Sequence, residues 1–163
     1  MDYLKKEYKF AFDLVTFVMQ TYAPEWKTYN LLPKSRMENT CLTVNISNAV
    51  KRMLDGPTAY TASYAFDCWF KKQQINLKNI KDLMQKVTID FCMEGYNPIK
   101  FLEICCLISE LSALAYIYGV SGAPQYAIFC ITHILSYFKK KGEFSDFSWL
   151  ELDKYAKDVG PDD

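Results

Sequence analysis

The fold of this chain depends on one stretch and on the apolar run that follows it: Asp90-Phe91-Cys92-Met93-Glu94-Gly95-Tyr96-Asn97-Pro98-Ile99-Lys100. Gly95 predicts the end of one helix, because glycine readily adopts the backbone conformation of a C-terminal cap. Asn97 predicts the start of the next helix as its N-cap, and Pro98 suits the first helical position, where its missing N–H costs nothing. We therefore expect a tight junction between two helices here.

The helix that follows, expected over residues 101–120, is apolar on nearly every side. A helix of this kind belongs at the centre of a bundle or in a membrane. Glu103 and Glu110 interrupt it, and the cost of carboxylates in lipid favours the bundle. The two glutamates are seven residues apart and so share a face. We expect them to mark the side of the central helix that solvent reaches.

Lys100 lies in the first turn of this helix, where the helix dipole disfavours a cation. The position indicates that some other interaction requires a positive charge there. An ordinary exposed lysine is the other interpretation, because an exposed charge near a helix end costs only a few tenths of a kcal/mol.

Length and composition are those of one globular domain over residues 1–163, with a polar tail from about residue 159. Half of the residues are apolar and 16% are aromatic, which is ample material for a core. Lys plus Arg equals Asp plus Glu at 19 each, and no basic tract is long enough to follow a nucleic acid. We therefore expect no nucleic-acid partner.

The two ends of the sequence are polar, so neither a secretory signal nor a transmembrane anchor is expected. The six cysteines lack Cys-x-x-Cys spacing and fall mostly among apolar residues. This pattern predicts buried free thiols in a reducing compartment.

Apolar side chains recur at intervals of three and four residues along most of the chain, which is typical of helices. The expected helices cover 2–22, 39 or 40 to 55, 58–72, 76–94, 101–120, 124–141 and, as short helices, 145–158, with a loop over 25–38. Strand-like alternation is absent. The prediction is an all-α bundle of about seven to eight helices around a central buried helical hairpin.

The residues needed for catalysis do not form a recognisable set. His133 is the single histidine, and no nucleophile–histidine–acid set, phosphate-binding glycine loop or zinc spacing can be assembled. A glycosidase-like pair of Glu103 and Glu110 would need a polar cleft, which the surrounding aromatic residues do not supply. We expect no enzymatic activity, no cofactor and no metal site.

The segment Glu94-Gly95-Tyr96-Asn97-Pro98-Ile99-Lys100 resembles the first homology motif of the B-cell lymphoma-2 (Bcl-2) apoptosis regulators, which typically runs acidic-Gly-x-Asn-Trp-Gly-Arg. Residues 133–147, with His133-Ile134, Gly142-Glu143-Phe144 and Phe147, look like the second motif. The third, death-motif spacing is matched by Ile46, Val50, Met53 and Asp55, and residues 7–26 are similar to the fourth motif. Pro98 and Ile99 replace the usual Trp-Gly, and Lys100 replaces Arg. A short first loop and a missing anchor are shared with viral members of the family.

This resemblance implies an anti-apoptotic function without a cofactor. Family members hold the death-motif (BH3) helix of pro-apoptotic proteins of the Bim, Bak and Bax type in an apolar groove formed by the second to fifth helices. The resemblance puts Lys100 in the place of the arginine that pairs with the ligand's aspartate. The expected groove residues are Tyr60, Tyr64, Phe66, Leu83, Val87, Phe91, Glu94, Asn97, Lys100, Ile104 and Leu107. The implied location is the cytoplasm of a host cell, with at most peripheral contact with mitochondria.

Several alternatives stay open within the same resemblance. The groove of some viral relatives is filled, and the fold then serves as an interaction module in innate-immune signalling. Membrane insertion and a pro-apoptotic role are further alternatives, because a fold alone does not fix a function. An apolar groove without its ligand is also a surface for self-association, so a homodimer remains open.

Overall fold

The computed structural model describes residues 5–26 and 41–159. Within these ranges the chain forms seven helices and no strand, which confirms the predicted all-α bundle. The helices are α1 (Lys6–Tyr22), α2 (Val44–Leu54), α3 (Pro57–Trp69), α4 (Leu77–Glu94), α5 (Pro98–Ile117), α6 (Ala123–Lys140) and α7 (Asp146–Val159). None of them is both long enough and apolar enough to cross a membrane.

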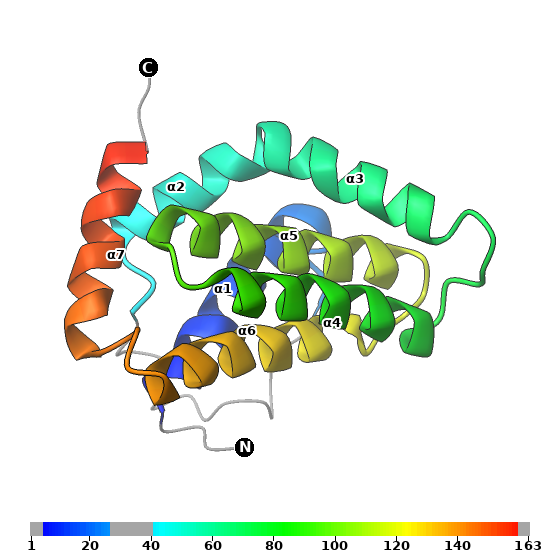
Figure 1. The fold of residues 1–163 in the computed structure, drawn as a ribbon. Coiled ribbons are helices and arrows are strands. Elements are labelled where there is room, and N and C mark those ends of the chain that lie inside the picture. Colours follow the sequence, from blue (N-terminus) through cyan, green and yellow to red (C-terminus); the bar gives the residue numbers. More distant parts are fainter. Residues whose placement is uncertain (1–4, 27–40, 160–163) are drawn as a thin grey trace.

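Helix α5 lies at the centre of the bundle and packs against each of the other six helices (Figure 1). Its position follows from its sequence, because a helix that is apolar on all sides can bury its surface only by being surrounded. α6 returns alongside α5 and completes the predicted central hairpin. α6 is nevertheless amphipathic, with Phe129 and His133 on its exposed side.

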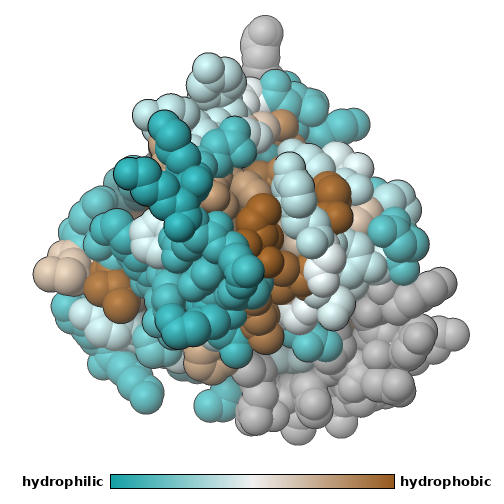
Figure 2. All heavy atoms as spheres, turned by 90° about the vertical axis from the view of Figure 1, so that its right-hand side faces the viewer, coloured by the Kyte–Doolittle hydropathy of each residue, from teal (hydrophilic) through white to brown (hydrophobic). Residues whose placement is uncertain are grey.

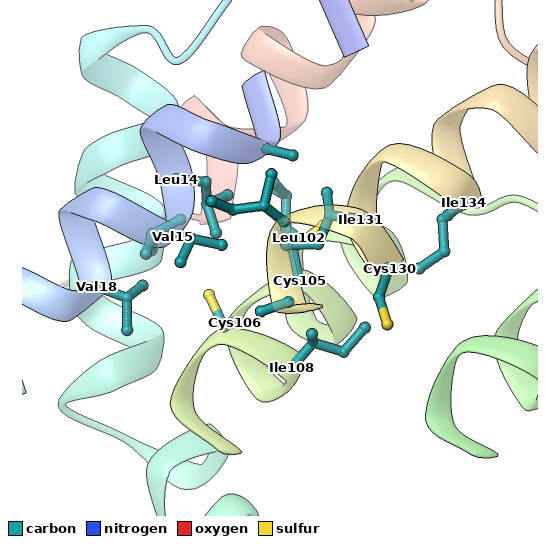
Figure 3. Packing of buried hydrophobic residues seen from close by; sticks show 14 of the residues in the cluster. Leu14, Val15, Val18, Leu102, Cys105, Cys106, Ile108, Cys130, Ile131 and Ile134 are labelled. Carbon is teal, nitrogen blue, oxygen red and sulfur yellow. The ribbon is translucent and has the colours of Figure 1, made fainter. Parts of the chain in front are cut away.

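Helices α1, α5 and α6 pack against one another in the core. Figure 3 shows these side chains close together: Leu14, Val15 and Val18 from α1, Leu102, Cys105, Cys106 and Ile108 from α5, and Cys130, Ile131 and Ile134 from α6. All six cysteines are free thiols, as predicted. Their predicted burial holds for Cys105, Cys106 and Cys130 but is wrong for Cys68, which lies on the exposed face of α3.

The junction between α4 and α5 has the predicted geometry. Gly95 ends α4 with φ of 100°, a conformation that side chains oppose. The Asn97 side chain caps α5 by accepting a hydrogen bond from the Lys100 backbone N–H at 2.9 Å. Pro98 is the first residue of α5, the position predicted for it, and the apolar run from residue 101 follows within the same helix.

Aromatic packing holds this junction in place. The Tyr96 ring contacts the rings of Phe101, Phe138 and Phe144 at centroid distances of 5.3–5.9 Å. The Tyr96 N–H donates to Glu143 Oε1 at 3.3 Å, which ties the junction to the connection between α6 and α7. The start of α5, and therefore Lys100, has a defined position.

Several predicted boundaries differ from the structure: α3 ends at Trp69 instead of residue 72, and α5 ends at Ile117 instead of residue 120. α2 begins at Val44, because Thr43 is its N-cap and accepts a hydrogen bond from the Ile46 N–H. The predicted starting residues, like most of the predicted loop over 25–38, lie outside the described residues. Residues 146–159 form one helix instead of several short ones, because Trp149, Leu152 and Ala156 repeat on a single buried face.

Removing the cap at the start of α5 should destabilise the whole bundle. Asn97→Ala leaves the Lys100 N–H without its partner, and we expect the free energy of unfolding to fall by about 1 kcal/mol in urea titrations. Asn97→Asp retains a capping oxygen and serves as the control. Equal stability of the two variants would contradict the role of this cap.

Candidate functional site

A pocket of about 230 Å³ lies between the start of α3 and the first half of α5. Its lining residues are Pro57, Thr58 and Thr61 from α3, and Lys100, Glu103, Ile104 and Leu107 from α5. The α5 residues follow the i, i+3, i+4, i+7 spacing of one helical face. The structure thus brings together Lys100, Ile104 and Leu107 of the predicted groove residues.

The pocket has an apolar floor and a charged rim. Ile104 and Leu107 are half-buried, whereas Lys100 and Glu103 are exposed. The Thr61 hydroxyl donates to the Pro57 carbonyl at 2.9 Å, and all three residues of the α3 wall are uncharged. A partner bound in this pocket can therefore contact apolar side chains at the floor and charged side chains at the rim.

Neither charged group of the rim has an ion-pair partner in residues 5–26 and 41–159. Lys100 is the third residue of α5, close to the positive end of the helix dipole. An anion supplied from outside the described chain would relieve this unfavourable placement.

The remaining polar groove residues lie near the pocket without lining it. Glu94 and Asn97 are exposed at the α4–α5 junction, and the Asn97 side-chain oxygen is occupied by the cap. Among residues 5–26 and 41–159, neither the Glu94 carboxylate nor the Asn97 amide nitrogen has a hydrogen-bond or ion-pair partner, so an external partner can use both.

The aromatic and aliphatic groove residues divide into exposed and buried groups. Tyr60 and Tyr64 project from α3 and are 79% and 67% exposed. Val87 on α4 is half-buried, whereas Phe66, Leu83 and Phe91 are buried in the core. These last three side chains belong to the core and do not line the pocket, and Phe66 contacts Tyr118 near the opposite end of α5. A helical spacing alone does not distinguish core from groove.

Helices α3 and α4 both pack on α5, which lies between them (Figure 1). The Trp69 Nε1–H donates to the Asn79 carbonyl at 2.9 Å and ties the end of α3 to the start of α4. This arrangement places the pocket on the α3 side of α5, near the end of α5 that carries Lys100.

A second hollow lies at the opposite end of α5. Figure 2 looks onto the end of the molecule that carries the α3–α4 and α5–α6 connections, and it shows a stripe of apolar atoms beside hydrophilic ones. Residues of these connections, including Ile75, Leu77, Tyr118 and Val120, line a pocket of about 340 Å³. None of the predicted site residues lines it.

From the sequence we did not predict the α3 wall of the pocket, which is formed by Pro57, Thr58 and Thr61. We also did not predict that Glu103 lines the rim. The wall had no sequence signal, because it exists only through the packing of α3 on α5. Glu103 had one, since it follows Lys100 by three residues and therefore shares its face.

Glu110 is buried, and the prediction that it marks the solvent side of α5 is wrong. It is 2% exposed, because α1 covers this part of α5. The Tyr22 hydroxyl donates to Glu110 Oε2 at 2.5 Å, while Oε1 has no hydrogen-bond partner among the described residues. Burial raises the pKa of Glu110 to about 7, although the hydrogen bond from Tyr22 lowers it.

This carboxyl group should make stability depend on pH. The pKa of Glu110 is about 7 in the folded chain and 4.5 ordinarily, so the folded state binds the proton more tightly. The free energy of unfolding should therefore fall as pH rises from about 4.5 to about 7, by about 3 kcal/mol in total. Urea titrations near pH 5 and pH 8 measure the difference.

The variant Glu110→Gln keeps the shape of the side chain and removes its charge. It should be more stable than the wild type near pH 8 and show a flatter pH profile. Glu103→Gln, at an exposed position of the same helix, should retain the wild-type profile. If Glu110→Gln also retained that profile, the pH dependence would have to come from other groups.

We compared the chain with protein-family models, with curated proteins and with solved structures, and none of the three comparisons gives a match. Its resemblance to the Bcl-2 family therefore rests on the motifs quoted above.

Proposed function

We propose that this protein is an anti-apoptotic Bcl-2-like protein that binds the death-motif (BH3) helix of pro-apoptotic proteins of the Bim, Bak and Bax type. One observation carries the proposal: Lys100 stands unpaired within the described part of the chain, at the rim of a pocket with an apolar floor. The motif resemblance puts the ligand-pairing cation at the same residue.

The physics of the proposal is helix-in-groove recognition. An amphipathic helix offers apolar anchors at i, i+3 or i+4 and i+7, and Ile104 and Leu107 provide an apolar surface for them. Lys100 would pair with an aspartate of the ligand. As an exposed point charge instead of a two-pronged arginine fork, it would contribute at most about 1 kcal/mol. We therefore infer modest affinities or a narrow range of ligands.

The pocket would have to widen for a whole helix, since small-molecule sites alone occupy roughly 300–1,000 Å³. α3 is the helix best suited to move. It buries only Ala62 and Phe66, whereas the longer α5 is buried along most of its length. Elements with few buried apolar contacts open at low free-energy cost. Displacement of α3 from α5 would lengthen the groove past Leu107.

A second candidate is an interaction module with a closed groove, acting in innate-immune signalling. The burial of Phe66, Leu83 and Phe91 favours it, because these side chains fill space that an open groove would expose. Such a module needs another surface, and the outer face of α7 carries exposed Phe147 and Leu150.

The motif resemblance extends the proposal to origin and location. The substituted first motif favours a viral member of the family, acting in the cytoplasm of the host cell and meeting mitochondria only peripherally. We also propose that two copies of the chain can associate through the groove. Sedimentation with and without a death-motif peptide would show whether peptide binding competes with this dimerisation.

Charge reversal at the rim tests the proposed function. We expect calorimetry to detect binding of at least one death-motif peptide of the Bim, Bak or Bax type to the wild type. Lys100→Glu replaces attraction with repulsion and should weaken that binding by about tenfold or more. Lys157→Glu, an exposed reversal on α7, is the matched control and should bind as the wild type does.

Two results would contradict the proposal. One is the absence of binding by every peptide, which would favour the closed-groove module. The other is equal weakening by Lys100→Glu and Lys157→Glu, which would mean that net charge and not the pocket governs binding.

A further inference from the structure

Glu103 gives the pocket a second charge that an acidic ligand alone would not use. It lines the same pocket as Lys100, is exposed, and has no ion-pair partner within residues 5–26 and 41–159. The other lining residues, from α3 and from the floor, are uncharged. The rim therefore holds one cation and one anion.

The order and spacing of these charges are fixed by α5. With a rise of about 1.5 Å per residue, Lys100 and Glu103 lie about 4.5 Å apart along the helix axis and on the same face. A helix that lies along α5 presents its own neighbouring side chains at positions i and i+3 or i+4, at a similar spacing. The two helices can therefore pair two charges at once.

A ligand with an acidic residue alone would gain little from this rim. Its carboxylate would be attracted by Lys100 and repelled by Glu103 less than one helical turn away, and the two effects oppose each other. A basic residue facing Glu103 would convert the repulsion into a second attraction. Arrangements of this kind contribute mainly to specificity and orientation.

We propose that the groove selects amphipathic helices with an acidic and a basic residue three or four positions apart on the docking face. The acid lies against Lys100 and the base against Glu103. This inference rests on the proposed function and names the chemistry of its partner. It also fixes the direction of docking, because a helix with the two charges exchanged meets repulsion at both positions.

The test is a double-mutant cycle with one synthetic death-motif peptide that carries such an acid–base pair. Four versions are needed: the parent, one with glutamine in place of the base, one with a second acid in place of the base, and one with acid and base exchanged. Calorimetry at low salt gives their dissociation constants for the wild type, for Glu103→Gln and for Glu103→Lys. Glu151→Gln, which removes an exposed carboxylate of α7, is the matched control.

For the wild type and Glu151→Gln, loss of the base should weaken binding about threefold, and exchange of the charges about tenfold. For Glu103→Gln, loss of the base should have no effect. The variant Glu103→Lys should bind best to a peptide with a second acid in place of the base.

The inference is overturned if loss of the base has the same effect on the wild type and on Glu103→Gln, or if the exchanged peptide binds the wild type as tightly as the parent does. These results leave the proposed function intact as long as Lys100→Glu still weakens binding of the parent. Failure of the parent to bind the wild type refutes the proposed function, and the selection by Glu103 with it.

Discussion

The burial of α5 on all sides is the constraint on which the rest of the structure depends. Each of the other six helices packs against it, because its apolar surface is continuous around the helix. Its first turns reach the surface, where the chain places Asn97, Lys100 and Glu103, and its far end reaches the surface at Ile117. The charged rim of the pocket is thus a consequence of where the buried helix begins. The cap at Asn97 and the rings around Tyr96 give that beginning a fixed position.

The same constraint carries a polar group into the core. Glu110 lies on α5 where α1 covers it, and its carboxyl group is held by the Tyr22 hydroxyl with one oxygen left without a partner among the described residues. Burying a carboxyl oxygen without a hydrogen bond costs free energy, and an aliphatic side chain of similar size would avoid that cost. The pair links α1 to α5 through a directional contact, which apolar packing does not provide. α5 therefore combines a charged site near its start with a titratable contact in its second half.

Local signals in the sequence predicted the helices well, because caps and breakers act on neighbouring residues. Gly95, Asn97 and Pro98 fixed the α4–α5 junction, and the burial pattern of α5 followed from its composition. Such local signals could not predict which side chains are covered by another helix. Glu103 and Glu110 share one face, yet only Glu110 lies under α1. Aromatic spacing likewise placed Tyr64 and Phe66 on one helix without showing that the first is exposed and the second buried.

The most direct measurement is an amide-resolved NMR titration of the protein with a death-motif peptide. If α5 forms the floor of the binding site, the largest shifts should fall on Thr58 and Thr61 of α3 and on Lys100, Ile104 and Leu107 of α5. Small shifts there, together with large shifts on the outer face of α7 around Leu150, would contradict a groove centred on the start of the buried helix.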